Sequence, residues 1–458
     1  MSAPTAHFIG IGGIHMSGLA RILLDEGWSV SGSDLVASHL TQDLTARGAT
    51  VKIGHAASNV CGADLVICTA AVKDENTEVA AARAAGVELV TRAQMVSRIA
   101  QGRSSLTVAG THGKTTTATM LTLILREAGL DPTYLLGGEY QGLDSQAARG
   151  SGPQAVIEAD EYARAFHEYS PAIAVLTNVE RDHLDYYGDE SALQEAFLGY
   201  GRTIQQGGTL IVGADSAAAL SVAKRLASER PDVTVETFGT TTAATWRADA
   251  VEENPTFTRF EIAESNVLLG KVELAVPGLF NVRNALAATA IGLRGGAPFE
   301  AAVRALQTFR GVHRRFEQTG EAAGITVMDD YAHHPSEIAG TVQAARRRFA
   351  ARRLVFLFQP HTYSRSTYLL PGFQRCFNGV DLLFVMDTYA AREEPSAGLN
   401  AMQLADSITS PAAHYAGPLE DAVPTVCAAL QPGDVCFTVG AGDVDAAGPL
   451  IIERLQRS

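Results

Sequence analysis

Residues 106–129 have the sequence LTVAGTHGKTTTATMLTLILREAG, and this stretch decides the fold of the chain. Its first four residues predict a buried strand, and the run TTTATMLTLILREAG predicts a helix. The loop between them presents backbone N–H groups at a helix start, where such groups bind an anion. Short Val/Ile/Leu runs alternate with Ala/Leu/Arg-rich stretches along most of the chain, so we expect an α/β fold with parallel sheets.

The loop in this stretch is a candidate triphosphate site. Lys114 is placed to reach the β- and γ-phosphates, and the Thr115 hydroxyl is placed to bind Mg²⁺. The pattern is a shortened phosphate loop, because Val108 stands six residues before the lysine where glycine is usual. The alternative is a chance Gly-Lys-Thr at a helix start. The predicted ligand is ATP, held by Gly110, Thr111, His112, Gly113, Lys114, Thr115 and Thr116.

Two further strand ends carry candidate metal ligands. The segments IEADEYARAF and TNVERDHLDYYG supply Glu158, Asp160, Glu161, Asn178, Asp182, His183 and Asp185. Because the carboxyl ends of parallel strands gather at one edge, we expect these side chains beside the phosphate loop. Glu158 and His183 are favoured as ligands of a second divalent ion. Alternatively, Asp182 and Asp185 cap a helix and His183 is a satisfied, partly buried side chain.

A second glycine-rich loop, GIGGIHMSG at residues 10–18, follows a predicted strand and precedes a helix. Gly10, Gly12 and Gly13 allow a pyrophosphate to approach the backbone, and Asp34 is placed as a ribose-binding acid. His15 stands where the dinucleotide fingerprint requires glycine. A tight turn without a ligand is therefore an alternative, and so is a nicotinamide-dependent oxidoreductase.

The composition bounds the class of protein. A length of 458 residues predicts three domains. The net charge of −14 argues against general binding to nucleic acid or to a membrane surface. Five cysteines without a CxxC pair predict a cytoplasmic protein whose thiols are small apolar fillers. No apolar run reaches the roughly 18 residues of a spanning helix, and the N-terminal stretch predicts a folded strand rather than a signal peptide.

The predicted domains are residues 1–100, 101–311 and 312–458. Within the second, residues 246–278 alternate apolar and polar side chains, which predicts antiparallel hairpins. We place the last hinge at residues 311–313.

Seven motifs in this order resemble the Mur ligase family: GTHGKTTT, EADEY, TNVERDHLD, NVRNALAA, RRFE, DDYAHHP and FQPHTYSR. The family consists of ATP-dependent, amide-forming ligases of peptidoglycan precursor synthesis and cell wall biogenesis, and the resemblance covers nearly the whole chain. It implies a Rossmann-like first domain for a UDP-sugar and a central P-loop ATPase-type domain with a mostly parallel sheet and a small antiparallel one. The third domain is then Rossmann-like and binds an amino acid.

The resemblance also assigns roles to residues. It implies catalytic roles for Lys114, Glu158, His183 and Arg315, with Thr115, Glu158 and His183 as metal ligands. It implies that Asn281 and Asn284 line the adenine and that Asp330 touches the ribose. It places Tyr331, His361 and Arg365 near the amino acid, and Gly10, Gly12, Gly13, Ser33 and Asp34 at the sugar nucleotide. Three residues depart from the family pattern: His15 replaces glycine, Phe280 replaces histidine and Thr362 replaces arginine.

The implied substrates are UDP-N-acetylmuramate, L-alanine and ATP with two Mg²⁺ ions. FQPHTYSR favours single L-alanine as acceptor, whereas EADEY favours a recycling activity that attaches a tripeptide. A non-catalytic nucleotide-binding regulator is a further alternative.

Two segments of the third domain are open to simpler interpretations. Arg365 is predicted on a polar loop, where it either pairs with a carboxylate of the amino acid or is a solvated surface residue. Residues 333–335 predict a helix start with proline in its first turn, either facing the central domain or carrying surface histidines.

Overall fold

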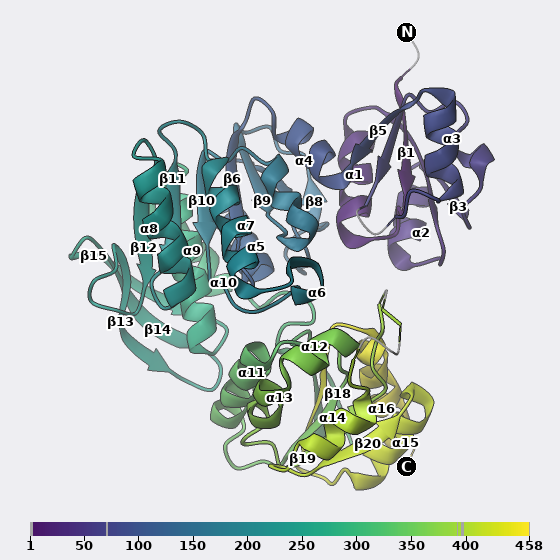
Figure 1. Cartoon of the computed structure of the whole chain (residues 1–458). Coiled ribbons are helices and arrows are strands. Elements are labelled where there is room, and N and C mark those ends of the chain that lie inside the picture. Colours follow the sequence, from purple (N-terminus) through teal and green to yellow (C-terminus); the bar gives the residue numbers. More distant parts are fainter. Residues whose placement is uncertain (1–2, 70–71, 392, 395–397, 458) are drawn as a thin grey trace.

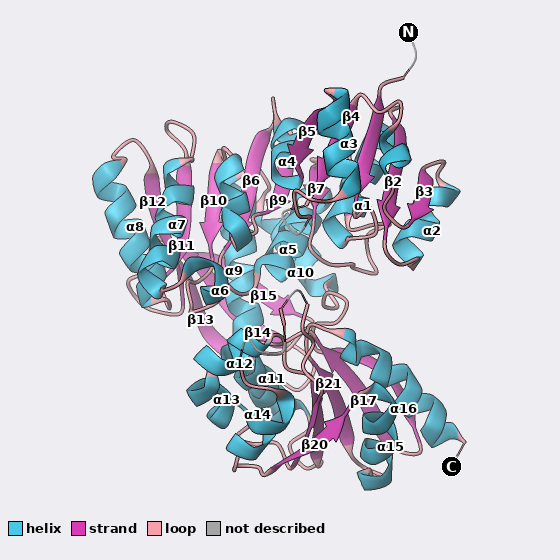
Figure 2. Cartoon of the chain, turned by 45° about the vertical axis from the view of Figure 1, so that its right-hand side comes forward, coloured by secondary structure: helices cyan, strands magenta, loops and turns pink. Residues whose placement is uncertain are grey.

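Three β-sheets follow one another along the chain, each packed against helices (Figures 1 and 2). The computed structural model describes residues 3–69, 72–391, 393–394 and 398–457. The predicted α/β class with three domains is confirmed. No described helix combines the length and the apolar character needed to cross a membrane.

The first sheet is entirely parallel, with the order β3-β2-β1-β4-β5. Its strands are β1 (Thr5–Ile9), β2 (Ser29–Asp34), β3 (Thr50–Ile53), β4 (Leu65–Cys68) and β5 (Glu88–Thr91), and its helices are α1 (Ile14–Asp25), α2 (His39–Ala46), α3 (Thr77–Ala85) and α4 (Arg92–Ala100). The strand order reverses at β1, so the glycine loop at residues 10–13 lies at the switch point, where open α/β sheets bind ligands.

The central sheet has the order β15-β14-β13-β12-β11-β10-β6-β9-β7-β8. Its strands are β6 (Ser104–Ala109), β7 (Thr133–Leu135), β8 (Ala147–Ala148), β9 (Gln154–Glu158), β10 (Ile173–Leu176), β11 (Thr209–Gly213), β12 (Thr234–Gly239), β13 (Trp246–Glu253), β14 (Thr258–Glu264) and β15 (Val267–Leu274). Its helices are α5 (Lys114–Glu127), α6 (Leu184–Tyr187), α7 (Glu190–Arg202), α8 (Ala217–Glu229), α9 (Leu279–Arg294) and α10 (Phe299–Thr308). The antiparallel hairpins predicted for residues 246–278 are confirmed as β13–β15.

The third sheet has the order β16-β17-β21-β18-β19-β20, and only its edge strand β16 is antiparallel. Its strands are β16 (Glu317–Ala322), β17 (Ile325–Asp330), β18 (Leu354–Phe358), β19 (Leu382–Met386), β20 (Ala413–Gly417) and β21 (Val435–Val439). Its helices are α11 (Pro335–Arg348), α12 (Tyr363–Tyr368), α13 (Leu370–Cys376), α14 (Ala401–Ser407), α15 (Leu419–Ala429) and α16 (Ala447–Gln456).

The apolar cores divide the chain unevenly. One core joins Leu19 and Ile99 of the first domain to Phe197 of the central domain without interruption. The cores of the third domain, among the described residues, contain nothing before residue 316. The first two domains therefore share buried apolar surface, whereas the third is held to them by other contacts.

The cysteines only partly follow the prediction. Cys376 and Cys436 are buried, as expected of apolar fillers, and burial raises the pKa of both thiols. Cys61 is exposed, so the prediction is wrong for this residue.

A buried carboxylate organises the first domain. Glu78 on α3 is fully buried and accepts hydrogen bonds from Ser33 Oγ at 2.5 Å, Asn59 Nδ2 at 2.6 Å and the Ala56 N–H at 3.2 Å. Burial alone would raise the pKa of Glu78, but the His7 imidazole, 3.6 Å away, and these hydrogen bonds lower it to about 2. The ionised carboxylate therefore links four segments of the domain.

We expect Glu78→Ala to lower the free energy of unfolding by about 1–3 kcal/mol near neutral pH, because it leaves buried donors unpaired. Since the folded-state pKa lies below the ordinary value of 4.5, the contribution is present above that value and is lost as the pH falls towards 2. The free energies of unfolding of wild type and variant should therefore differ less at about pH 3 than at about pH 7, and urea unfolding at both pH values measures this difference. The exposed Glu75→Ala is the control, and an equal loss in both variants contradicts the prediction.

Candidate active site

Three strand ends meet at one edge of the central sheet. β6 lies between β9 and β10, with Val108 paired to Glu158 and Ala109 paired to Leu176. The phosphate loop leaves β6 at this edge, and the segment that carries Asp182 and His183 leaves β10 beside it. The parallel register thus brings together the candidate residues that lie up to about 75 residues apart in sequence.

The phosphate loop is braced by the segment that follows β10. Thr177 Oγ1 donates to the carbonyl of His112 at 2.7 Å, and Asn178 Oδ1 accepts from the His112 N–H at 2.9 Å. Gly110 has φ +131°, and a Cβ there would lie 1.9 Å from Thr177 Oγ1. Only glycine fits this position, which explains why the loop keeps a glycine although it departs from the longer P-loop pattern.

We expect Gly110→Ala to weaken ATP binding roughly 10-fold, which corresponds to about 1.4 kcal/mol, because the loop must move away from Thr177. Gly129→Ala is the matched control: it also places alanine at positive φ, but its Cβ meets no atom within 4 Å. Titration with a fluorescent ATP analogue measures the effect. Equal binding by both variants would show that the close approach to Thr177 has no bearing on the nucleotide.

Lys114 lies at the centre of a buried charge cluster. Its Nζ donates to the carbonyls of Gly110 and Thr111, at 2.6 and 3.0 Å, and pairs with Glu161 Oε2 at 2.8 Å. Burial would lower the pKa of Lys114, but Glu161 and Asp160 raise it, so the ammonium stays charged. Glu161 Oε1 is also 3.6 Å from His183 Nε2. The carboxylate beside His183 is therefore Glu161, which is not among the favoured ligands.

Glu158 and Thr115 form the second half of this cluster. The Thr115 hydroxyl donates to Glu158 Oε1 at 2.9 Å, and the Gly137 N–H donates to Oε2 at 2.7 Å. Burial raises the pKa of Glu158, opposed chiefly by Lys114. A hydroxyl and a carboxylate in contact at the start of α5 are hard oxygen donors of the kind that Mg²⁺ takes together with phosphate oxygens. The residues present thus fit a magnesium–triphosphate group.

A cavity of about 1250 Å³ opens beside the loop, between the central and third domains. Its lining includes the predicted nucleotide residues His112, Gly113, Thr115, Thr116, Asn281, Asn284, Arg315 and Asp330. Lys114, Glu158 and His183 are not among the lining residues, but Thr115 connects the cavity to their cluster. Burial raises the pKa of Asp330 to about 6. Phe280, which replaces the family's histidine, also lines the cavity.

The third domain contacts the central domain through a buried ion pair. Arg365 Nε and Nη2 donate to Asp182 Oδ1 at 3.0 and 2.9 Å, and both side chains are about 5 % exposed. Burial would raise the pKa of Asp182, but the guanidinium holds it well below its ordinary value. Arg365 lies in helix α12, so the predicted polar loop and solvated surface are both wrong. Asp182 supplies the countercharge that permits this burial.

Of the amino-acid residues implied by the resemblance, His361 contacts this pair, and Tyr331 lies beside Arg315. Arg365 Nη1 donates to His361 Nδ1 at 2.8 Å, and the His361 ring stacks on Tyr389. The ring of Tyr331 lies 4.9 Å from the guanidinium carbon of Arg315. Burial, together with the charge of Arg365, lowers the pKa of His361 to about 4, so its imidazole is neutral. For Arg365 to bind an amino-acid carboxylate through two hydrogen bonds, it has to exchange at least one of its present partners.

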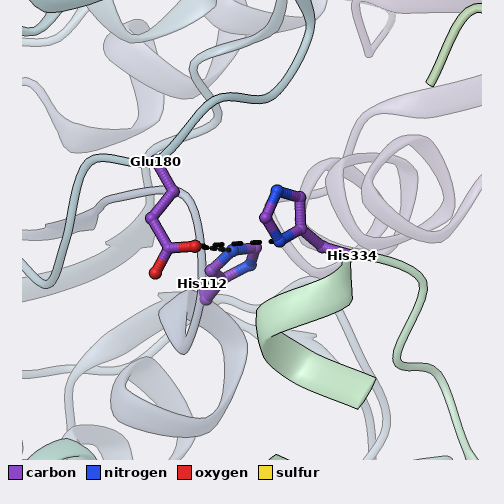
Figure 3. Close-up of side chains that lie close together, drawn as sticks. All are labelled: His112, Glu180 and His334. Carbon is purple, nitrogen blue, oxygen red and sulfur yellow. Dashed lines mark ion pairs between the residues drawn. The ribbon is translucent and has the colours of Figure 1, made fainter. Parts of the chain in front are cut away.

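A second group of side chains crosses the same domain boundary (Figure 3). His334 caps α11, is buried, and its Nε2 is 3.1 Å from the Arg181 carbonyl. The helix start with Pro335 in its first turn is confirmed, whereas surface histidines are wrong because His333 is also largely buried. His112 lies 3.1 Å from Glu337 and 3.5 Å from Glu180. Burial would lower the pKa of His112, but these carboxylates raise it to about 10.

In the glycine loop of the first domain, the Gly12 N–H is already hydrogen-bonded within the domain. Asp34 Oδ2 accepts from the Gly12 N–H at 2.8 Å, so the acid holds the loop that is predicted to bind a pyrophosphate. Ser33 is fully buried against Glu78. Burial and the charge of Arg92 lower the pKa of His15 to about 3. Gly10 and Gly13 remain beside the N-terminus of α1.

Sequence reasoning missed Glu337 and Arg92. Glu337 bonds back to the N–H groups of His333 and His334, and Glu three residues after a helix cap is the local sequence signature. No local pattern indicates that its other oxygen reaches His112 across the domain boundary. Arg92 donates a hydrogen bond of 2.9 Å to Asp160, which is 68 residues away in sequence. No local sequence pattern indicates this pair either.

The fold and the site define a class: a three-domain α/β protein whose central domain carries a phosphate loop beside a large cavity lined by its central and third domains. Residues 5–104 match the Mur ligase family catalytic domain, residues 108–292 the Mur ligase middle domain, and residues 314–442 the Mur ligase glutamate ligase domain. The chain belongs to the Mur ligase family.

Full-length relatives support this membership. The chain is 42% identical to the UDP-N-acetylmuramate–L-alanine ligase of Salinibacter ruber, over 98% of this chain and 94% of that protein. The crystal structure of the UDP-N-acetylmuramate–alanine ligase of Thermotoga maritima is similar, with a TM-score of 0.82, 30% identity and 99% of both chains covered. A murein peptide ligase of Psychrobacter arcticus gives a TM-score of 0.76 and 25% identity, covering 100% of this chain and 99% of that one.

Proposed function

We propose that this enzyme joins L-alanine to the lactyl carboxylate of UDP-N-acetylmuramate and splits ATP to ADP and phosphate. The observation that carries the proposal is the buried group of Lys114, Thr115 and Glu158 beside a large interdomain cavity. Two relatives, at 42% and 40% identity over nearly the whole chain, carry this activity in their names.

ATP binds in the cavity with its phosphates at the N-terminus of α5. Asn281 and Asn284 lie on the first turns of α9, where we place the adenine, and Asp330 of the third domain faces the ribose. Arg315, which also lines the cavity, supplies positive charge to the phosphates. Thr115, Glu158 and His183 are the proposed ligands of two Mg²⁺ ions, which neutralise charge on the transferring phosphate when bound. Glu161 pairs with Lys114, and its other oxygen lies 3.6 Å from His183 Nε2.

The reaction proceeds through an acyl phosphate. The sugar carboxylate attacks the γ-phosphorus, the bond to the bridging oxygen breaks, and ADP leaves. The Lys114 ammonium stabilises the charge on the transferring oxygens. The neutral amine of L-alanine then attacks the acyl carbon, the bond from this carbon to the phosphate oxygen breaks, and phosphate leaves while the nitrogen releases one proton to solvent. Contact between the central and third domains excludes water from the acyl phosphate, which would otherwise hydrolyse.

Residues of all three domains contribute to the proposed sites. Residues 1–100 bind the sugar nucleotide through Gly10, Gly12, Gly13, Ser33 and Asp34, residues 101–311 bind ATP, and residues 312–458 bind L-alanine near Tyr331, His361 and Arg365. For the pyrophosphate to reach the Gly12 N–H, Asp34 has to release it. The expected partners are these small molecules rather than nucleic acid or membrane, and the expected location is the cytoplasm.

Phosphate release with UDP-N-acetylmuramate and ATP, scanned over single amino acids, tests the proposal. We expect L-alanine to give the highest rate, with one amide formed per phosphate. A higher rate with a murein tripeptide would favour the recycling activity, to which the neighbour from Psychrobacter arcticus is related by name. ATP binding without turnover would favour a regulator, and no ATP-linked phosphate release would favour the oxidoreductase.

A further inference from the structure

The contact between the phosphate loop and the third domain contains three ligand atoms in one small triangle (Figure 3). His112 and Glu180 come from the central domain, and His334 caps α11 of the third. The His112 Nε2, Glu180 Oε2 and His334 Nδ1 atoms lie within 4.8 Å of one another. Across the described part of the chain, only this trio of His, Cys, Asp or Glu side chains meets that limit.

Two of the three distances are close to those between neighbouring ligands of a small tetrahedral ion, and the third is within 4.8 Å. His112 Nε2 is 3.5 Å from Glu180 Oε2, and His334 Nδ1 is 3.7 Å from the same oxygen. Metal–ligand bonds of about 2.0–2.2 Å in a tetrahedron separate the ligand atoms by roughly 3.3–3.6 Å. Two imidazoles and a carboxylate are a ligand set that Zn²⁺ and similar transition metals favour over Mg²⁺.

The outer nitrogen of each imidazole already has an orienting partner. His112 Nδ1 is 3.1 Å from Glu337 Oε1, and His334 Nε2 is 3.1 Å from the Arg181 carbonyl. Histidines that bind metals almost always donate their second N–H to a carboxylate or a backbone carbonyl in this way. The His112 ring therefore directs its Nε2 towards Glu180. His334 Nδ1 now accepts the helix-cap hydrogen bond from the Ser336 N–H at 3.3 Å and lies 2.7 Å from Ser336 Oγ, and it exchanges these contacts for the ion on binding.

We propose that His112, Glu180 and His334 form a binding site for a transition-metal ion such as Zn²⁺, and that the ion links the phosphate loop to the third domain. The Ser336 hydroxyl now lies among the three ligand atoms, 2.6 Å from Glu180 Oε2 and 3.2 Å from His112 Nε2, and it turns aside or becomes a fourth ligand. Any proton on His112 Nε2 is released to solvent when the ion binds. None of the three residues is a proposed magnesium ligand, although His112 and Glu180 also line the cavity proposed for ATP, and the metal proposal does not depend on the proposed reaction.

Titration of the full-length, nucleotide-free enzyme with Co²⁺ in excess Mg²⁺ tests the proposal. We expect one equivalent to give the visible absorption of four-coordinate Co²⁺ without a thiolate charge-transfer band, since no cysteine is involved. His334→Asn removes a ligand but keeps an acceptor at the helix cap, and we expect it to weaken binding roughly 100-fold or more.

Two control variants separate this site from others. His333→Asn changes the neighbouring histidine, whose Nδ1 faces the Tyr331 carbonyl at 3.0 Å, and we expect it to retain the equivalent. His183→Gln removes a proposed magnesium ligand, and we expect this variant also to bind one equivalent of Co²⁺. The proposal is overturned if His334→Asn binds Co²⁺ as wild type does, if His183→Gln no longer binds one equivalent of Co²⁺, or if the spectrum shows thiolate ligation.

Discussion

Replacing Lys114 with alanine should lower ATP-dependent phosphate release by roughly 10³-fold, because the transferring phosphoryl group then lacks its buried cation. The effect should fall on kcat more than on the KM for ATP, since the cavity beside Thr115 and Arg315 remains. Lys114→Ala also leaves Glu161 without the ammonium that now lies 2.8 Å away. Glu161 is largely buried, so part of its charge is expected to be lost by protonation.

Steady-state phosphate release with all three substrates measures this effect. Lys224→Ala is the control, because it removes an exposed lysine from α8 by the same substitution. Circular dichroism and the unfolding midpoint establish that Lys114→Ala is folded. A folded Lys114→Ala enzyme that ligates at the rate of Lys224→Ala would contradict the proposed function itself.

The sequence was sufficient for the fold and for the local part of the candidate site. The strand-loop-helix pattern at residues 106–129 places Lys114 and Thr115 at a helix start, and the helix does begin at Lys114. Parallel-sheet geometry then brings Glu158 to Thr115, because β9 pairs with β6 in register. These relations follow from periodicity and from general rules of sheet architecture, so local sequence contains them.

Contacts between domains were not predictable in the same way. Arg365 and Asp182 are 183 residues apart, and nothing near Arg365 indicates that α12 is buried against another domain. A six-residue helix is too short to show a clear helical period, so the sequence predicts a polar loop there. The same reasoning gives surface histidines at residues 333 and 334. Burial of polar groups at a domain boundary depends on the partner surface, which composition does not reveal.

The uneven division of the apolar cores leads us to expect domain motion at the third domain rather than between the first two. Because the first two domains share one core, their separation would expose apolar side chains such as Leu19 and Phe197 to water. The third domain meets the central domain through ion pairs and hydrogen bonds, including Arg365–Asp182 and His112–Glu337. Such a contact can open with its charged groups returning to water, so we expect substrate entry and product release to involve this boundary.

Breaking the pair between Arg365 and Asp182 should therefore have the second largest effect on enzymatic activity, after Lys114→Ala. Truncating one partner of a buried, hydrogen-bonded charge pair costs about 2–5 kcal/mol, which corresponds to a loss of roughly 30-fold or more. If the third domain opens when the pair is broken, the cost appears in kcat/KM rather than in the unfolding of the central domain. We expect Arg365→Leu and Asp182→Leu each to lower kcat/KM for L-alanine to this extent.

The double variant Arg365→Leu/Asp182→Leu distinguishes a contact between domains from a direct role in binding. If Arg365 acts mainly through Asp182, the two effects overlap, and the double variant should lose no more activity than either single one. If Arg365 instead binds the amino-acid carboxylate, the loss in Arg365→Leu should fall on the KM for L-alanine and should add to that of Asp182→Leu. Arg375→Leu is the control, because it makes the same substitution at an exposed arginine on the neighbouring helix α13. Independent, additive losses would show that the ion pair is not what couples the third domain to the site.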